Sequence, residues 1–404
     1  MVYTFSMKKN LKHIFVALLT ALFFSAFIYF EYFGLTNKLV NSIFGLLSLY
    51  MLLHVSKKSV LFAGFFIGIF WFYWVGYSFK YTGVGYLSPF VTLGFGIIYM
   101  LFFGVLAFFN NPFLRATILF ALSFVELFNF NWLQIQAIFT DSYIGLHSWQ
   151  LALILFVLAF NLKKFYFLPL LLLVFTLNIN PPQPKKAPLN IKLVQTDIKQ
   201  NIKWSREELP KTIKLGFNEI NKAIKQNYDV IVFPESFYPF YMNKHPRFLE
   251  KLLQLSKYIT IITGSLYSKN HNHYNVSYIL ENGKYSIAKK FVLVPFGEYV
   301  PLPKFARDYI NNTFFAGQAD FKPANKPTDF YIKGVKFRNA ICYEATSKEI
   351  YKGDVKFVIA MSNNAWFAPS IEPTLQKILM RYYGRKNNVT IYHSANYKFS
   401  GVVF

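Results

Sequence analysis

Apolar residues form long, nearly uninterrupted runs over the first 180 positions, whereas further along they form short segments separated by polar residues. A run of about 20 apolar residues is long enough to cross a bilayer as a helix. Seven runs meet or approach this length, and the last two are the shortest: roughly 13–33, 39–55, 60–79, 88–109, 113–130, 146–160 and 165–178. The pattern therefore predicts a membrane domain of about seven helices over residues 1–180.

Basic residues in the connections between these runs predict the orientation of the membrane domain. Eight of them lie in alternate connections, and only Lys38 and Lys80 lie in the others. Because Lys and Arg are retained on the cytoplasmic side, the N-terminus is predicted to be cytoplasmic. The first run lacks a small-residue cleavage site, so we expect an uncleaved span. An odd number of spans then places the rest of the chain on the outer face.

Glu126 falls within the fifth predicted span, where an acidic side chain is costly and often functional. Asn129 and Asn131 lie nearby, so the alternative is a carboxylate that is hydrogen-bonded within the helix bundle. Both interpretations stay open from the sequence.

A proline-rich segment, residues 181–188, is predicted to be a stiff linker to a second domain over residues 189–404. Strand and helix patterns alternate beyond it. Strands are predicted over 191–195, 230–233, 259–264, 274–280, 284–293, 335–341, 355–361 and 389–393, and helices over 205–226, 246–257 and 373–385. This alternation predicts an α/β layered fold, specifically an α-β-β-α sandwich.

Charge separates the two halves as clearly as hydropathy does. The first 180 residues hold ten Lys or Arg and three acidic residues, which leaves 33 basic and 16 acidic residues for the remainder. A basic domain beside a membrane domain is suited to anionic lipid headgroups. No basic run with interleaved aromatic residues indicates nucleic-acid binding, and no motif indicates a metal or nucleotide cofactor.

Three reactive side chains are predicted to lie at strand ends, where α/β proteins place their sites. Glu235 follows a buried strand and could act as a base, Lys290 could hold an oxyanion, and Cys342 could be a nucleophile. Cys342 is the single cysteine and lies at a strand-to-helix turn, where N–H donors are expected to lower the pKa of the thiol. Taken singly, each has a structural alternative: a buried apolar thiol, a strand-end cap and a solvated lysine.

Aromatic residues cluster directly after Glu235 and on a later loop. Consecutive aromatic side chains on a loop suit lipid contacts or a lid, although packing beneath the loop is the alternative. The predicted lipid-contact set is Phe237, Tyr238, Phe240, Trp366 and Phe367, with Tyr241 and Met242 in the same run.

The order Glu235, Lys290, Cys342 resembles the nitrilase superfamily. Longer motifs are similar to those of the apolipoprotein N-acyltransferase family: residues 293–301 (LVPFGEYVP), 341–344 (ICYE) and 362–367 (SNNAWF), and also Gln200 with Lys203-Trp204. Seven spans before a nitrilase-like domain are typical of that family. The sequence differs from the family pattern at Asn364 and Lys377, where the family usually has Asp and His. The family also continues with an eighth span, which we expect to be missing here.

The resemblance implies roles for individual residues. Cys342 would be the nucleophile, Glu235 the general base and Lys290 the oxyanion partner. Supporting roles would fall to residues around the pocket and at its lipid entrance: Glu298, Tyr343, Glu344, Asn275 and Trp204. A strand-edge hydrogen bond is the alternative for Asn275.

The implied activity is transfer of an acyl chain from a phospholipid to the N-terminal diacylglyceryl-cysteine of an apolipoprotein, without a cofactor. The enzyme would reside in the bacterial inner membrane, with its catalytic domain in the periplasm. Three alternatives remain from the sequence: a membrane-tethered carbon–nitrogen hydrolase acting on a soluble substrate, a truncated inactive relative, and a transporter. The transporter is disfavoured because the spans offer a single acidic candidate, Glu126.

Overall fold

The computed structural model describes residues 2–81, 83–160, 168–179, 181, 184–295, 297–299 and 321–404. The start of the seventh predicted span (165–167), part of the linker (182–183) and three positions of the 293–301 motif (296, 300 and 301) lie outside these ranges. The chain divides into two compact units. Unit 1 comprises residues 1–127 and 132–181, and unit 2 comprises 128–131 and 182–404.

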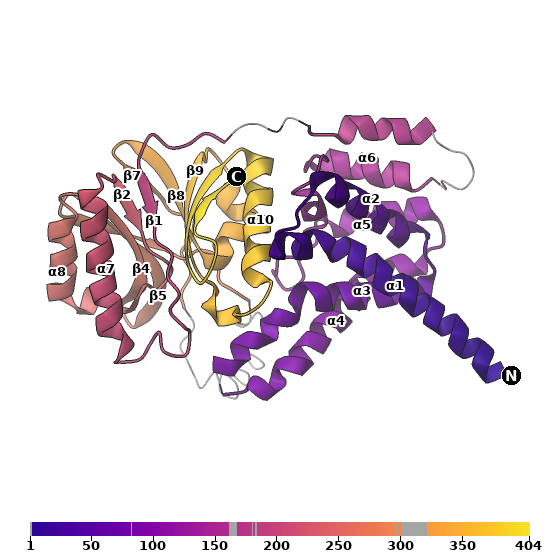
Figure 1. Ribbon diagram of the computed structural model, residues 1–404, viewed down its shortest axis with the longest axis horizontal. Coiled ribbons are helices and arrows are strands. Elements are labelled where there is room, and N and C mark those ends of the chain that lie inside the picture. The colour runs from indigo at the N-terminus through magenta and orange to yellow at the C-terminus, as the bar shows by residue number, and fades with distance from the viewer. Residues whose placement is uncertain are drawn as a thin grey trace. The chain divides into compact units, whose positions relative to one another are not determined.

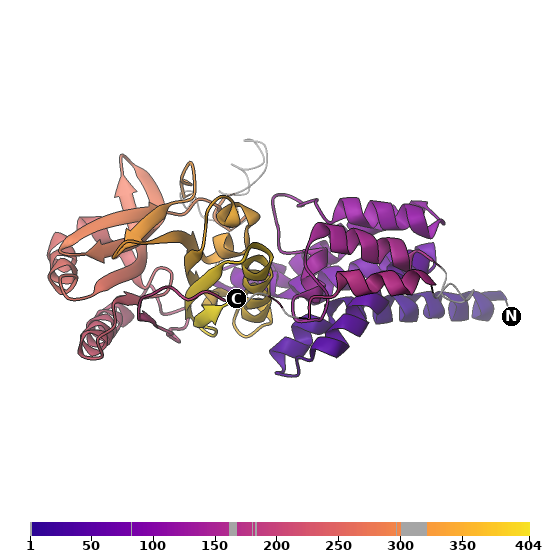
Figure 2. The ribbon, with the colours of Figure 1, turned by 90° about the horizontal axis from the view of Figure 1, so that it is seen from above.

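Unit 1 is helical, and its helices run alongside one another (Figures 1 and 2). The described α-helices are α1 (Val2–Tyr32), α2 (Lys38–His54), α3 (Lys57–Phe72), α4 (Ser88–Gly104), α5 (Pro112–Leu122) and α6 (Ser148–Leu158). Short 3-10 segments are η1 (Tyr73–Tyr81), η2 (Gly85–Leu87), η3 (Val105–Phe108), η4 (Ile135–Phe139) and η6 (Leu168–Thr176).

Small residues allow two of these helices to pack closely. A Cβ atom on Gly64 would lie 2.5 Å from the Tyr99 carbonyl oxygen, and one on Gly68 would lie 2.4 Å from the Phe95 carbonyl oxygen. Only glycine therefore permits the observed approach of α3 and α4, as is common between membrane helices.

Three helical stretches are long and apolar enough to cross a membrane: Asn10–Tyr32, Lys57–Tyr81 and Gly85–Phe108. The helices at 38–54, 112–122 and 148–158 are apolar but shorter. These six agree in position with the first six predicted runs, although the fifth predicted run (113–130) is longer than its helix.

The helix in the fifth run ends at Leu122, and the chain turns through two residues with positive φ angles before the run ends. Phe128 and Asn129 have φ angles of 53° and 60°, in the left-handed region that L-residues rarely occupy. Glu126 therefore lies after α5 and not within a spanning helix, which corrects its predicted position.

Unit 2 contains two β-sheets. Sheet A has the order β1 (Ile191–Leu193), β2 (Val230–Val232), β4 (Thr260–Lys269), β5 (Asn272–Glu281) and β6 (Lys284–Lys289), and β3 (Tyr238–Tyr241) pairs with β4. Sheet B has the order β11 (Gly401–Val403), β10 (Thr390–Asn396), β9 (Phe357–Asn363), β8 (Val335–Ile341) and β7 (Asp329–Ile332). Most predicted strands are present within a few residues of their expected bounds, whereas β3, β7 and β11 were not predicted.

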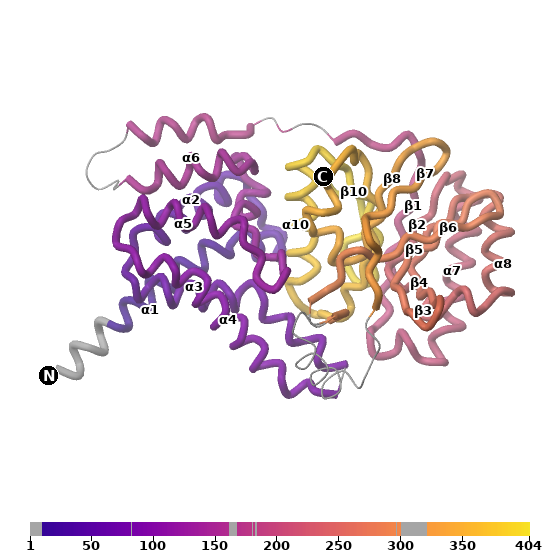
Figure 3. The backbone as a smooth tube through the Cα atoms, turned by 180° about the vertical axis from the view of Figure 1, so that it is seen from behind, coloured from indigo at the N-terminus to yellow at the C-terminus, as the bar shows by residue number. Residues whose placement is uncertain are grey.

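Helices cover the outer faces of both sheets (Figures 1 and 3). α7 (Glu208–Lys225) and α8 (Pro246–Leu255) pack on sheet A through a core that includes Ile220, Leu252 and Ile261. α10 (Glu372–Asn387) lies beside sheet B. Between the sheets, Val232 and Ile262 of sheet A pack with Ile359 of sheet B. The predicted α-β-β-α sandwich is confirmed.

The hairpin of β5 and β6 turns where the sequence predicted it. Asn282 and Gly283 have φ angles of 51° and 74°, the conformation that an Asn-Gly hairpin turn requires. This register matters for function because β5 carries Asn275, and Lys290 directly follows β6.

Candidate active site

Glu235 lies just after β2 and is almost fully buried. Its Oε1 accepts a hydrogen bond from Asn275 Nδ2 at 2.8 Å, and its Oε2 accepts one from the backbone N–H of Asn363 at 3.0 Å. A Cβ on Gly264 would lie 2.7 Å from the Glu235 Cα, so glycine is needed in β4 for this turn to fit. Two different sheets thus fix one carboxylate.

Lys290 is 1% exposed and is held by two carboxylates. Its Nζ lies 2.8 Å from both carboxylate oxygens of Glu298 and 3.7 Å from Glu235 Oε1. Burial alone would lower the pKa of this ammonium, but Glu298 and Glu235 outweigh burial and raise it. Lys290 is therefore a permanently charged cation beside Glu235.

Glu298 is itself positioned by the chain, because its Oε2 accepts a hydrogen bond from the backbone N–H of Val294 at 2.9 Å. Asn275 also donates to Glu298 Oε1, at 3.4 Å. We call Glu235, Asn275, Lys290 and Glu298 the base cluster. All four were predicted as site residues, and the structure brings them together.

Cys342 begins a short 3-10 helix, η8 (Cys342–Thr346), directly after β8, with a φ angle of 56°. Its side chain is partly accessible. Gln376 Nε2, on α10, lies 3.9 Å from the sulfur. Burial and the charge of Glu235 raise the pKa of the thiol well above its usual range, while Lys290 acts in the opposite direction.

This direction corrects the prediction of a lowered thiol pKa. A single 3-10 turn has a small dipole. The free-energy cost of burying a thiolate therefore exceeds the stabilisation that this dipole provides. The thiol of the free protein is therefore neutral and needs a base to become a nucleophile. Glu235 and Lys290 both interact electrostatically with Cys342, so they are close enough to influence its ionisation.

Glu344 links the Lys290 segment to the Cys342 segment. Its Oε1 accepts hydrogen bonds from the backbone N–H groups of Phe291 at 2.5 Å and Val292 at 3.0 Å, and its Oε2 accepts one from that of Ile341 at 2.6 Å. Burial raises the pKa of Glu344 to about 7, and Lys290 and these N–H donors oppose the rise. Glu344 thus positions two chain segments of the site.

Tyr343 holds a short segment of the first half of the chain that belongs to unit 2. Its hydroxyl donates to the Asn129 carbonyl oxygen at 3.0 Å and accepts from the Asn131 backbone N–H at 2.9 Å. Its ring stacks on Phe130 with centroids 6.1 Å apart. The residue next to the thiol thus fixes a segment that is remote in sequence.

Lys203 is a buried residue of the site that the sequence analysis did not single out. It is 2% exposed, and its Nζ donates to the Glu235 carbonyl oxygen at 3.1 Å. Burial lowers the pKa of Lys203 to about 8, although Glu235 and Cys342 partly offset this effect. Its place directly before Trp204, in a motif already noted, was the signal that could have identified it.

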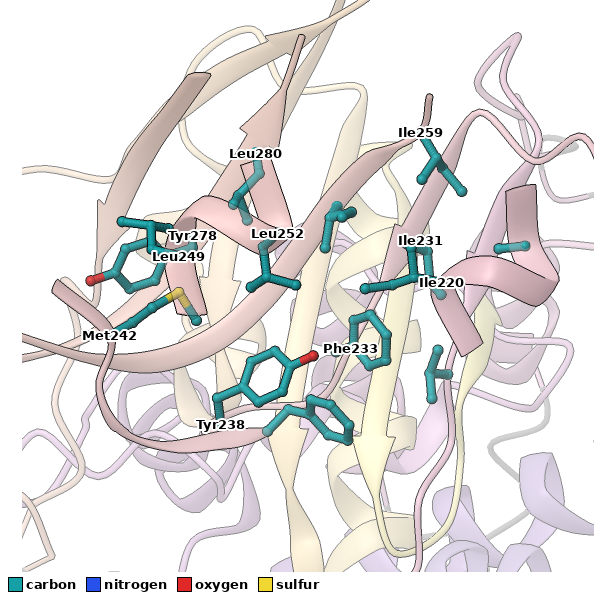
Figure 4. Close-up of a cluster of buried hydrophobic side chains, with 14 of the residues drawn as sticks. Ile220, Ile231, Phe233, Tyr238, Met242, Leu249, Leu252, Ile259, Tyr278 and Leu280 are labelled. Carbon is teal, nitrogen blue, oxygen red and sulfur yellow. The ribbon is translucent and has the colours of Figure 1, made fainter. Parts of the chain in front are cut away.

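The predicted lipid-contact set divides into buried and accessible residues. Phe237 and Tyr238 are at most 1% exposed and belong to the core beneath α7 and α8, where Figure 4 shows Tyr238 beside Phe233. The prediction that these two contact lipid is wrong, because β3 joins sheet A and turns them into its core. Phe240 packs partly against the same core.

Trp366 and Phe367 are half-buried, and Trp204 is 48% exposed. Of the predicted lipid-contact set, Phe240, Trp366 and Phe367 are therefore partly accessible, and Trp204 is accessible at the predicted lipid entrance. No group of three or more potential metal-ligating side chains occurs among the residues that the structure describes.

Comparison with known proteins agrees with this architecture. Residues 11–179 match the apolipoprotein N-acyltransferase integral membrane domain, and residues 191–394 match the carbon–nitrogen hydrolase domain. The chain therefore combines a membrane domain with an α/β domain of the nitrilase class.

Relatives cover nearly the whole chain. An apolipoprotein N-acyltransferase of Wolinella succinogenes is 41% identical, over 96% of this chain and 95% of its own length. One from Helicobacter pylori is 35% identical, over 90% of this chain and 87% of its own. The chain belongs to the apolipoprotein N-acyltransferase family.

Solved structures with similarity include a carbon–nitrogen hydrolase superfamily protein from Xanthomonas campestris. It is 12% identical, with a TM-score of 0.40, and the match covers 54% of this chain and 79% of that one. An amidase of the nitrilase superfamily from Nesterenkonia AN1 is 13% identical, with a TM-score of 0.38, over 55% and 81%.

Proposed function

We propose that this protein transfers an acyl chain from a membrane phospholipid to the α-amino group of the N-terminal diacylglyceryl-cysteine of apolipoproteins, through a thioester on Cys342. Membership of the family over almost the entire chain carries this proposal. The buried contact of Glu235 with Lys290, both acting on Cys342, supports the assignment of the chemistry.

The proposed arrangement places residues 1–180 in the bacterial inner membrane, 181–188 as a linker and 189–404 as the catalytic domain in the periplasm. The long apolar helices and the bias of basic residues toward alternate connections support this topology. A membrane location also gives the enzyme direct access to a phospholipid donor.

In the first half-reaction, Glu235 takes the proton of the Cys342 thiol, and the sulfur attacks the ester carbonyl carbon. Lys290 stabilises the tetrahedral oxyanion. The C–O bond then breaks, and Glu235 returns the proton to the departing lysophospholipid oxygen. A base is required here because the Cys342 thiol has a raised pKa.

In the second half-reaction, the acceptor amine attacks the thioester carbonyl carbon. An N–C bond forms, the C–S bond breaks, and Glu235 transfers a proton from nitrogen to the departing sulfur. The free thiol is regenerated, so the two substrates react in ping-pong order. Glu298, Asn275 and Glu344 position these groups, and Trp204 with Trp366 and Phe367 offers apolar surface for lipid.

The test uses the full-length protein in detergent with phospholipid carrying a labelled acyl chain. We expect mass spectrometry to find the acyl group on Cys342, and hydroxylamine to release it as expected for a thioester. Cys342→Ala should form no adduct while still inserting into membranes. Normal lipoprotein acylation in a Cys342→Ala strain would contradict the proposal, and hydrolysis of small amides without phospholipid would favour the hydrolase alternative.

A further inference from the structure

Three buried polar side chains on α10 and on the segment that precedes it carry oxygens without a hydrogen-bond partner in the part of the chain that the structure describes. They are Glu372 Oε2, Gln376 Oε1 and Asn364 Oδ1, on residues that are at most 1% exposed. An unpaired buried polar atom costs about 1–3 kcal/mol. Three such oxygens between residues 364 and 376 therefore call for an explanation. We call these three residues the helix cluster.

The helix cluster is tied to the reactive sulfur. Gln376 Nε2 lies 3.9 Å from Cys342 Sγ. Glu372 lies four residues earlier on α10, one helical turn away and on the same face. An ionised Glu372 would raise the pKa of the Cys342 thiol, so the two groups lie within electrostatic range of each other.

The chemistry of the helix cluster indicates what it would bind. Its unpaired groups are mainly acceptor oxygens, and one of them belongs to a carboxyl group. Such a set suits a ligand with several N–H donors and a positive charge, and it disfavours a phosphate. Burial, reinforced by Glu235, raises the pKa of Glu372 well above its usual range, so a cation beside it would restore the carboxylate.

We propose that Glu372 and Gln376 form the subsite for the primary amine that attacks the thioester. This inference rests on the proposed function and assigns new residues to its second half-reaction. Glu235 is less suited to hold an ammonium group, because both of its carboxylate oxygens already accept hydrogen bonds.

The proton balance of this step is complete. The ammonium group gives one proton to Glu372, which frees the nitrogen lone pair for attack. A second proton passes through Glu235 to the departing sulfur, and the third stays on the amide nitrogen. Glu372 later releases its proton to solvent.

The test separates the two half-reactions in the full-length protein. Wild type and Glu372→Gln are first acylated with labelled phospholipid. The acylated enzymes are then mixed with a diacylglyceryl-cysteinyl peptide, or with hydroxylamine, which is largely uncharged at neutral pH. We expect Glu372→Gln to raise the KM for the peptide about tenfold to hundredfold, because a charged hydrogen bond is lost. The rate of deacylation by hydroxylamine should change by a factor at least ten times smaller than the change in the peptide KM.

Gln376→Met is a second variant, and it changes no charge. We expect it also to raise the KM for the peptide more than it slows deacylation by hydroxylamine. Glu349→Gln is the matched control, since Glu349 pairs with Lys352 on the surface. An unchanged peptide KM in both variants, or equal slowing with peptide and hydroxylamine, would overturn the subsite. Failure of the wild type to acquire an acyl group would instead overturn the proposed function.

Discussion

The carboxyl groups of the base cluster and of the helix cluster differ in how fully they are hydrogen-bonded. In the base cluster, all four carboxylate oxygens of Glu235 and Glu298 have partners, whereas the amide oxygen of Asn275 has none among the described residues. In the helix cluster, each of the three residues, including the carboxyl group of Glu372, has a buried oxygen without a partner among the described residues. Groups paired before substrate arrives are preorganised for chemistry, whereas unpaired groups are available to a ligand. The comparison therefore assigns catalysis to one cluster and acceptor binding to the other.

Removing the base should have the largest effect. Glu235→Gln keeps the shape of the side chain but cannot take the thiol proton, and the raised thiol pKa makes that transfer necessary. We expect acyl-enzyme formation to slow about 10²- to 10⁴-fold, measured as the burst of lysophospholipid. A burst equal to that of Glu349→Gln would show that Glu235 is not the base.

Removing the cation should affect both rate and stability. Lys290→Met leaves Glu235 and Glu298 buried without a counter-charge, which typically costs about 3–5 kcal/mol. We expect a lower urea midpoint and acylation slowed roughly 10²-fold. Adding Glu298→Gln should recover part of the stability but not the rate. Full recovery of the rate would contradict an oxyanion role for Lys290.

Replacing Lys203 should have a smaller effect, limited to the acylation step that the base cluster catalyses. Lys203→Met removes the donor to the Glu235 carbonyl oxygen. Loss of one such hydrogen bond predicts acylation slowed about tenfold, with no change in the KM for the peptide acceptor. Lys211→Met is a control on an exposed lysine. A changed peptide KM with unchanged acylation would place Lys203 with the helix cluster instead.

The last prediction concerns the pH dependence of stability and leaves the chemical steps unchanged. His393 is buried, its Nδ1–H donates to the Phe399 carbonyl oxygen and its Nε2 accepts from Ser362, next to Asn363. Burial lowers the pKa of His393 to about 4 from 6.5. The unfolded chain therefore binds more protons between these values, and stability is lost as pH falls from 6.5 through 4.

The loss attributable to His393 is about 3 kcal/mol, at about 1.4 kcal/mol per pKa unit. His393→Asn should lose correspondingly less stability between pH 7 and pH 4, measured as the shift in urea midpoint. An identical shift in both proteins would mean that His393 does not titrate differently on folding.

Local patterns were sufficient for most of the architecture. The Asn282-Gly283 turn, the strand at 230–232 and the apolar run at 57–81 appear close to where the sequence places them, because each reflects a short-range preference. The length of the fifth helix was overestimated because hydropathy does not register where a helix ends within an apolar run, here at Leu122.

Predictions about the site were wrong where a role depends on whether the side chain is buried in the folded protein. Phe237 and Tyr238 read as loop aromatics, but β3 pairing with β4 places them in a core. Lys203 was noted only as part of a motif with Trp204, because its contact with the Glu235 carbonyl oxygen exists only in the folded protein. Glu372 directly precedes the predicted helix 373–385 and is the first residue of α10. The residues around it give no sign that one of its carboxyl oxygens would lack a partner among the described residues.

The sequence by itself determined the two-part organisation, the layered α/β fold and the family, because hydropathy, periodicity and motifs are properties of neighbouring residues. Only the tertiary structure decided which side chains share the environment of Cys342 and which of them remain unpaired. Burial, pKa shifts and hydrogen-bond satisfaction depend on residues such as 235, 290 and 372 that are far apart in the chain. Contacts between such distant residues exist only after the sheets have packed together.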